Sequence, residues 1–171
     1  MPDKIFDKLT IVIPAYNEES SIAETIETVR KICPGSKILV VDDGSKDKTY
    51  EKAKRAGAAV IAHPKNRGYG AALKTGFRNA STDYMAFIDA DLTYDPAIIP
   101  ILLKTVTDEV DCAWGNRFGG KINQMPRIRK IGNRIISIIF FMATFKKVVD
   151  CSSGERVLRR SVLRKIDFDQ L

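Results

Sequence analysis

Short apolar runs alternate along the chain with longer stretches in which apolar residues recur at helical spacing. The first run, residues 9–14, is almost wholly apolar and rich in β-branched residues, which is typical of a strand buried on both faces of a parallel sheet. Behind it, apolar side chains recur every three or four positions over residues 22–33, and this spacing predicts an amphipathic helix. Ser21 and Glu24 have the form of a capping box that starts this helix, and Pro34 ends it.

The same alternation continues to about residue 114. Further strands are predicted at 37–41, 58–62, 84–88 and 111–114. The helices predicted between them lie at about 47–56, across Leu73, Phe77 and Ala80, and from Pro96 to Val106. Unbroken alternation of strands and helices predicts an α/β fold with a mostly parallel central sheet flanked by helices. With 171 residues and no linker-like stretch, we expect the whole chain, residues 1–171, to form one domain.

The chain changes character near Gly115, where basic and helical sequence replaces the strands. Residues 115–165 contain 13 Lys or Arg but only two acids, Asp150 and Glu155, for a local charge of +11, whereas the whole chain carries +7. This asymmetry predicts an anionic partner, which in principle is a phosphate compound, a nucleic acid or an acidic membrane surface. We therefore divide the domain into residues 1–114 and a basic part, residues 115–171.

An apolar segment within the basic part has two possible locations. Residues 125–145 are predicted to form one long helix or two short ones, and residues 135–145 are apolar on nearly all sides. This run is too short to cross a bilayer, which takes about 20 residues. The helix is therefore either buried in the core or lies in a membrane interface.

Composition excludes several classes of site. Three widely spaced cysteines, without a C-x-x-C pair, argue against a disulfide framework or a zinc site and favour a reduced, cytosolic protein. His63 is the only histidine, which argues against a histidine-based metal site or a catalytic triad. The charged residues at the N-terminus are unlike a signal peptide, so we expect none.

Polar segments directly follow the predicted strands. In an open parallel sheet ligands bind outside the carboxyl ends of the strands, so these segments are expected to meet at one edge. They are residues 14–18, 42–45, 66–70 and 89–91. The first contains Pro14, Tyr16 and Asn17 where a dinucleotide fold has glycines, which argues against NAD or FAD.

Asp89 and Asp91 form the strongest candidate for a metal site. Two carboxylates at this spacing suit Mg²⁺ or Mn²⁺, which share their coordination with substrate phosphates. Chance alone predicts about one D-x-D pair in a chain of this composition, and a second pair, Asp167 and Asp169, lies near its end. Only the first pair follows a buried strand at the ligand edge, where two like charges are costly without a counter-ion.

Two other strand ends allow more than one interpretation. Asp42 and Asp43 either form a turn or accept hydrogen bonds from a nucleotide base or ribose. Asn66, Gly68 and Gly70 either shape a turn or lead into a helix whose N-terminus attracts anions.

Taken together, six motifs resemble the family 2 glycosyltransferases. Within that family the chain is similar to the dolichyl-phosphate mannose and glucose synthases and their bacterial undecaprenyl-phosphate relatives. The motifs occur in order as P-x-Y-N-E at 14–18, D-D-G-S at 42–45, N-x-G-x-G at 66–70, D-A-D-L at 89–92, G-N-R-F at 115–118 and D-C-S-S-G-E-R at 150–156. The resemblance implies a GT-A fold, a nucleotide-diphosphate sugar donor of the GDP-mannose or UDP-glucose type, Mg²⁺ or Mn²⁺, and inverting transfer of a hexose to a polyprenyl phosphate.

The resemblance also implies a role for individual residues. Asp89 and Asp91 would hold the metal and, with Arg117 and Arg129, form the catalytic set. Arg117, Arg129 and Asn133 would contact the acceptor phosphate or the β-phosphate of the donor. The residues expected to bind the donor are Pro14, Tyr16, Glu18, Asp42, Asp43, Asn66, Gly68, Gly70, Asp89, Ala90 and Asp91.

The sequence departs from the family pattern in three places. Thr93 stands where relatives often have Gln, and Glu155 stands where an aromatic residue or Met is common. Relatives also continue beyond the position of Leu171 with a further strand and interfacial helices. We therefore expect the acceptor side of this chain to be truncated or abbreviated relative to the family.

Three alternatives to transfer onto a polyprenyl phosphate remain. A phosphate is already anionic near pH 7 and needs no strong base, whereas a saccharide hydroxyl acceptor would need a carboxylate base such as Asp150 or Glu155. A catalytically incomplete module that binds nucleotide sugars is the second alternative. A nucleic-acid binder is disfavoured, because the basic residues lack interleaved aromatics and the ligand edge is acidic.

A lipid acceptor implies a cytoplasmic protein bound peripherally to the cytoplasmic face of a membrane.

Overall fold

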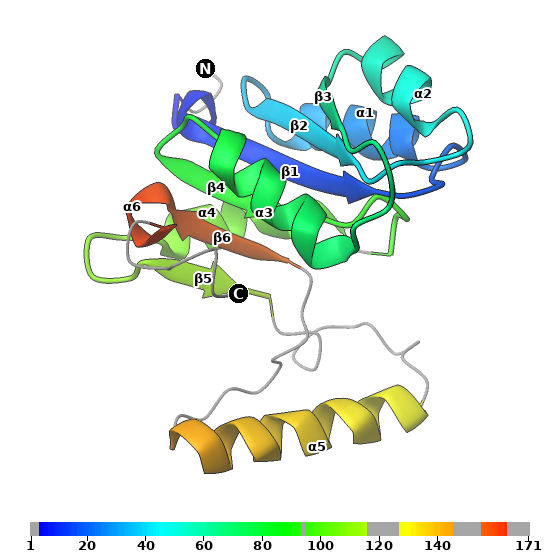
Figure 1. The fold of residues 1–171 in the computed structure, drawn as a ribbon. Helices are drawn as coiled ribbons and strands as arrows, with labels where there is room; N and C mark the ends of the chain where they lie inside the picture. The colour runs from blue at the N-terminus through cyan, green and yellow to red at the C-terminus, as the bar shows by residue number, and fades with distance from the viewer. Residues whose placement is uncertain (1–3, 94, 116–126, 146–154, 164–171) are drawn as a thin grey trace.

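The sheet and the helices that cover it position the strand ends. The computed structural model describes residues 4–93, 95–115, 127–145 and 155–163. Within these ranges, six strands form one sheet in the order β3-β2-β1-β4-β6-β5 (Figure 1). The strands are β1 (Leu9–Ala15), β2 (Lys37–Asp42), β3 (Ala59–Ala62), β4 (Tyr84–Phe87), β5 (Cys112–Trp114) and β6 (Arg156–Arg159). The helices are the 3₁₀ turn η1 (Phe6–Lys8), α1 (Ile22–Ile32), α2 (Thr49–Arg55), α3 (Tyr69–Asn79), α4 (Ile98–Thr105), α5 (Arg127–Thr144) and α6 (Arg160–Leu163).

The prediction of a mostly parallel α/β sheet is confirmed. Strand β1 pairs in parallel with β2 and β4, and β2 pairs in parallel with β3. Strand β6 runs antiparallel to both β4 and β5 and fills the place between them. The sequence predicts these four strands and also β5, which lies within the predicted range 111–114 and pairs antiparallel with β6. The carboxyl ends of the four parallel strands lie at one edge of the sheet (Figure 1).

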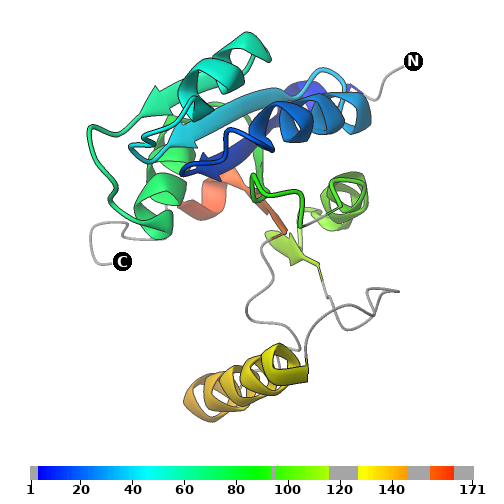
Figure 2. The same ribbon diagram turned by 90° about the vertical axis from the view of Figure 1, so that its right-hand side faces the viewer.

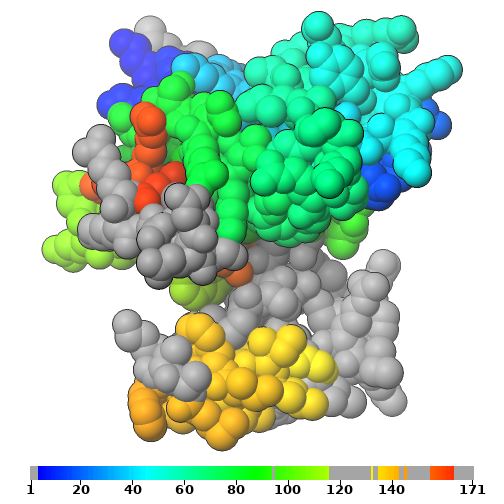
Figure 3. Space-filling view, viewed as in Figure 1, coloured from blue at the N-terminus to red at the C-terminus, as the bar shows by residue number. Residues whose placement is uncertain are grey.

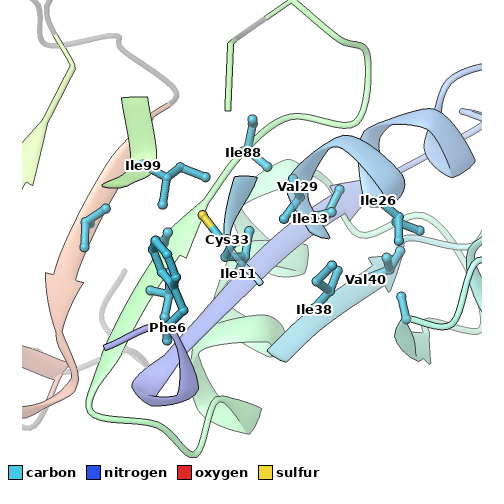
Figure 4. Close-up of a cluster of buried hydrophobic side chains, with 14 of the residues drawn as sticks. Phe6, Ile11, Ile13, Ile26, Val29, Cys33, Ile38, Val40, Ile88 and Ile99 are labelled. Carbon is cyan, nitrogen blue, oxygen red and sulfur yellow. The ribbon is translucent and has the colours of Figure 1, made fainter. Parts of the chain in front are cut away.

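Strand β1 is buried along its whole length. Leu9, Ile11 and Ile13 pack on one face with buried side chains of α1 and α4, as Figure 4 shows for part of this cluster. Val12 packs on the other face with Ala72 of α3. Because both faces of β1 are covered, the strand carries no charged residue, and its sequence is apolar except for Thr10, whose buried hydroxyl is hydrogen-bonded to Thr82.

Cys33 lies in the larger of these apolar clusters, directly after α1. Burial raises the pKa of its thiol to about 11. The side chain is therefore an uncharged thiol near neutral pH and behaves there as a small apolar residue of the core.

Two features of the sheet and its helices differ from the expectations. Ser21 stands at the N-cap of α1, but its side chain makes no capping bond and donates instead to the Glu18 carboxylate at 2.9 Å. The predicted capping box is therefore wrong in its contacts. Strand β6 and helix α6 were not expected, because each is only four residues long and β6 begins and ends with Arg.

Helix α5 is one continuous helix and stands apart from the sheet. Figures 1 and 2 both show the separation, and Figure 3 shows it on one face of the molecule. Its described apolar side chains are exposed, with Ile135, Ile139 and Phe141 each close to half exposed. The core-burial alternative for this helix therefore does not hold. Among the described residues, no helix has the length and apolar character needed to cross a membrane.

Gly76 is the point of closest approach between α3 and the sheet. A Cβ built on Gly76 would overlap Cγ1 of Val12, whereas a Cβ on Gly70 of the same helix meets no atom within 4 Å. The helix can therefore pack at this distance from β1 only because residue 76 has no side chain.

We predict that Gly76→Ala lowers the free energy of unfolding by about 1–2 kcal/mol, because overpacking a core outweighs the gain in helix propensity. Gly70→Ala is the matched control and should leave stability unchanged or raise it by up to about 1 kcal/mol. Urea unfolding of both variants measures the difference. Equal effects of the two substitutions would contradict the close packing at Gly76.

Candidate active site at the strand ends

A cleft of about 350 Å³ opens at the carboxyl ends of β1, β2 and β4. Its wall is formed by Pro14, Ala15, Tyr16, Glu18, Asp43, Asn66, Tyr69, Ala72, Asp89, Ala90 and Asp91. Eight of the eleven residues expected to bind the donor are in this set. Asp42, Gly68 and Gly70 are not, and Ala15, Tyr69 and Ala72 were not expected.

The loops that follow β1 and β2 are held together by hydrogen bonds. Asn17, at a φ of 57°, accepts the Lys46 amide on its Oδ1 at 2.8 Å, and its own amide donates to Ser45 Oγ at 2.9 Å. One residue further, the Glu18 amide donates to Thr49 Oγ1 at 2.8 Å. These contacts fix the position of the loop that carries Tyr16 and Glu18 at the cleft.

Asp47 joins the same two loops through its carboxylate. Its Oδ1 accepts the Thr49 amide at 3.0 Å, and its Oδ2 accepts the Glu19 amide at 3.1 Å. Partial burial opposes ionisation of Asp47, but the hydrogen bonds from Thr49 and Glu19 outweigh it, and its pKa lies below the usual value. This contribution to stability is present above the unfolded-state pKa and is lost as the pH falls through the lowered folded-state pKa.

Asp43 is buried, with 2% of its surface exposed, and its carboxylate holds the next loop. It accepts the Arg67 amide at 3.0 Å and the Gly68 amide at 2.7 Å. His63 Nδ1 lies 2.6 Å from Asp43 Oδ1, and His63 Nε2 lies 2.9 Å from Thr75 Oγ1 on α3. Because a carboxylate only accepts, His63 donates from Nδ1. The only histidine in the sequence thus links the carboxylate at the cleft to α3.

Asp42 forms a turn instead of lining the cleft. Its Oδ1 accepts the Ser45 amide at 3.1 Å and also a short hydrogen bond from the Ser45 hydroxyl. Gly44 follows at a φ of 73°, and a Cβ there would lie 2.6 Å from the carbonyl carbon of Lys65. The sequence allowed two roles for Asp42, forming a turn or binding the donor. In the structure Asp42 forms the turn and is not part of the wall of the cleft.

Asp89 and Asp91 follow β4 at the rim of the cleft. Asp89 is half-buried, and its Oδ1 accepts the Tyr69 hydroxyl at 2.6 Å. Ala90 between them is buried, and its carbonyl accepts Thr25 Oγ1 of α1 at 3.0 Å. This contact ties the backbone of the D-x-D segment to the helix, so that the two carboxylates are carried by a fixed strand end.

The chemistry of these two residues fits a divalent cation. Asp91 is exposed, and its Oδ1 accepts the backbone amide of Thr93 at 3.0 Å. Two oxygen donors are the usual protein share of a Mg²⁺ or Mn²⁺ site whose other ligands are phosphates and water. No group of three or more His, Cys, Asp or Glu side chains that could hold a metal gathers among the described residues, at this cleft or away from it.

The acceptor-side expectations fall largely outside the described residues. Arg117 and Asp150 lie outside them altogether, as do Asp167 and Asp169. Arg129 and Asn133 are on α5, four positions apart, but their side chains are not among those described. Gly68 and Gly70 stand at the start of α3, next to the cleft residue Tyr69.

Two residues of the site were missed by the sequence argument. Tyr69 occupies the second variable position of the N-x-G-x-G motif. The motif therefore pointed to this segment, but it did not single out the tyrosine, because any residue is allowed at that position. His63 follows the third strand directly, at the same edge as the other polar strand ends. Its position after a strand was the signal, although a lone histidine by itself predicts no site.

The mostly parallel sheet with an acidic cleft at its strand ends is an arrangement of the GT-A-like glycosyltransferase structures. A TM-score of 0.74 relates the chain to glucosyl-3-phosphoglycerate synthase from Mycobacterium tuberculosis, solved in complex with Mn²⁺, uridine-diphosphate-glucose and phosphoglyceric acid. The two are 25% identical, and the match covers 94% of this chain and 59% of that one. The chain belongs to glycosyl transferase family 2, whose sequence profile matches residues 10–167.

Three similar proteins come from archaea. An uncharacterized protein of Methanocaldococcus jannaschii is 38% identical over 95% of this chain and 69% of its own length. Dolichol-phosphate mannosyltransferase of Pyrococcus furiosus is 31% identical over 96% of this chain and 49% of its own length. Dolichyl-phosphate hexose transferase of Haloferax volcanii is 30% identical over 99% of this chain and 74% of its own length. The chain thus spans between half and three quarters of the length of these relatives.

We predict that Asp43→Asn lowers the free energy of unfolding by about 1.5–3 kcal/mol, because an amide cannot replace the carboxylate as acceptor for His63 and two backbone amides. Asp91→Asn is the control, because it makes the same change at an exposed carboxylate of the same cleft. It should change the free energy of unfolding by less than about 0.5 kcal/mol. Urea unfolding without added metal makes the comparison. If both variants are equally stable, the hydrogen bonds of the Asp43 carboxylate do not stabilise the loop that follows β3.

Proposed function

We propose that the chain is the catalytic domain of an inverting, metal-dependent glycosyltransferase. It moves a hexose from a nucleotide-diphosphate sugar, of the GDP-mannose or UDP-glucose type, to a polyprenyl phosphate. The observation that carries this proposal is the cleft in which Asp89 and Asp91 face the loops held by Asp43 and Asn17. Two of the relatives are named for transferring mannose or hexose to dolichyl phosphate, which supports the acceptor class.

Residues 1–114 bind the donor in this proposal. Asp89 and Asp91 hold Mg²⁺ or Mn²⁺, which when bound acts as a Lewis acid that neutralises the departing nucleoside diphosphate. Tyr16 and Glu18 line the same cleft from the loop after β1 and contact the nucleoside in this proposal. Because that loop is tied to the loop after β2, the nucleoside subsite is formed before the donor arrives.

The basic part, residues 115–171, binds the acceptor phosphate in this proposal through Arg117, Arg129 and Asn133. An acceptor phosphate attacks without a strong base, whereas a saccharide hydroxyl would need one. Glu155, a candidate for that base, is only 6% exposed and does not line the cleft. This burial favours a phosphate acceptor over a hydroxyl acceptor.

Helix α5 binds a membrane surface in this proposal. Ile136, Ile138, Met142 and Phe145 add to its exposed apolar surface, and Phe145 is 83% exposed. This helix combines exposed apolar side chains with a position in a segment of charge +11. It is therefore suited to a membrane interface, where the acyl chains are apolar and the lipid headgroups are anionic. The domain would then sit peripherally on the cytoplasmic face, next to its lipid acceptor.

We predict that Mn²⁺ together with GDP-mannose or UDP-glucose raises the melting temperature of the chain, since a ligand at 100 times its Kd stabilises by about 2.7 kcal/mol. Asp91→Asn should abolish the part of this shift that needs Mn²⁺. Asp95→Asn is the control, because Asp95 is an exposed acid that caps Ala97 at 2.9 Å and does not line the cleft.

The same variants separate the acceptor classes in a transfer assay. With the donor that binds, hexose should appear on a polyprenyl phosphate and not on soluble saccharides, and Asp91→Asn should lose transfer. Transfer to saccharides alone would establish the hydroxyl-acceptor alternative. Donor binding without transfer to either acceptor would identify a nucleotide-sugar-binding module.

We predict that the chain floats with anionic phospholipid vesicles at low salt and that Ile139→Glu with Phe141→Glu weakens this binding on the order of tenfold or more, because each apolar side chain contributes about 1.5–3 kcal/mol on burial. Ile101→Glu is the control, since Ile101 is an exposed apolar residue on α4. A folded wild-type chain that stays out of the lipid fraction would contradict the membrane assignment.

A further inference from the structure

Tyr69 makes a contact that the proposed function does not explain. It is the first residue of α3, and 51% of its surface is exposed. Its hydroxyl donates to Asp89 Oδ1 at 2.6 Å, across the cleft and 20 positions along the chain. A half-exposed aromatic side chain contributes little to a core, whereas the hydroxyl of Tyr69 contacts the carboxylate directly.

The backbone that carries Tyr69 is fixed on both sides. Before it, the Gly68 amide donates to the buried carboxylate of Asp43 at 2.7 Å. After it, Ala72 is buried against the sheet, and Gly76 allows the closest approach of α3 to β1. The phenol therefore reaches Asp89 from a rigid support, and its position does not depend on a mobile loop.

We propose that Tyr69 is a positioning residue for the divalent cation, acting through the carboxylate of Asp89. This inference rests on the proposed function, in which Asp89 is a metal ligand. An ionised carboxylate has about four lone-pair sites, so it can accept the phenol and still bind a cation. A short hydrogen bond to the carboxylate restricts its rotation and so lowers the entropy lost when the metal binds.

If Tyr69 orients Asp89, it should raise the affinity of the site for the metal even before the nucleotide sugar binds. Partners that orient a ligating carboxylate typically contribute 10- to 100-fold to metal affinity. Tyr69 lies in the wall of the cleft but needs no contact with the sugar or the acceptor to act in this way. Its removal should therefore be visible in binding of the metal alone.

The test measures Mn²⁺ binding to the full chain by electron paramagnetic resonance, without nucleotide. Tyr69→Phe keeps the ring and removes only the hydroxyl, and it should weaken Mn²⁺ binding about tenfold. Tyr50→Phe is the matched control, because Tyr50 lies on α2 with Lys54 over its ring at 5.8 Å and does not line the cleft. Circular dichroism and urea unfolding should show both variants folded.

Asp89→Asn separates this inference from the proposed function. If Asp89→Asn abolishes Mn²⁺ binding while Tyr69→Phe binds as the wild type does, the role of Tyr69 is overturned and the metal site stands. Tighter binding by Tyr69→Phe overturns it as well, since the phenol would then compete with the cation. If the wild-type chain binds no Mn²⁺, or Asp89→Asn binds it equally well, the metal site itself fails.

The double variant tests whether Tyr69 acts through Asp89. Where Asp89→Asn leaves measurable residual binding, adding Tyr69→Phe should weaken it no further, because the hydroxyl then has no carboxylate to orient. An equal loss in both backgrounds would show that Tyr69 contacts the metal environment independently and would overturn the proposed route.

Discussion

Burial of β1 on both faces is the constraint on which the site depends. All seven of its residues are buried, with α1 and α4 on one side and α3 on the other. Its parallel register with β2 and β4 brings the ends of these three strands to one edge. Along the strand the polar side chain of Thr10 is buried and hydrogen-bonded to Thr82 Oγ1 at 2.6 Å. Exposed side chains begin at Tyr16, where the chain leaves the sheet. The position of the cleft therefore follows from the packing of the core.

The aspartates at this edge differ in how far the protein itself satisfies them. Asp42 and Asp43 are buried, and Ser45, His63 and backbone amides occupy their oxygens. Asp89 is half-buried and tied to Tyr69, and Asp91 is exposed. Buried carboxylates must be paired or hydrogen-bonded to remain ionised, which makes the first two parts of the scaffold. Asp91, the exposed member of the pair that follows β4, retains the capacity to bind a ligand from outside the protein.

Local pattern predicted the four parallel strands and the helices between them, because each is long enough to show its period or its apolar run. It failed at β6, where four residues with Arg at both ends gave no such signal. It also failed at the start of α1, since Ser21 has a nearer partner in Glu18 than the capping amides. The contacts of His63 and Tyr69 each join residues 20 positions apart. Pairing of β2 with β3 brings Asp43 and His63 together, and packing of α3 on the sheet brings Tyr69 to Asp89.

The uneven charge of the chain has a physical reason under the proposed function. The cleft is lined by Glu18, Asp43, Asp89 and Asp91, which would repel a nucleoside diphosphate, so a cation is needed before that donor can bind there. The acceptor phosphate has no such need, because residues 115–165 carry a charge of +11. Two anionic substrates would thus be held by different means, one through a metal and one through Arg and Lys.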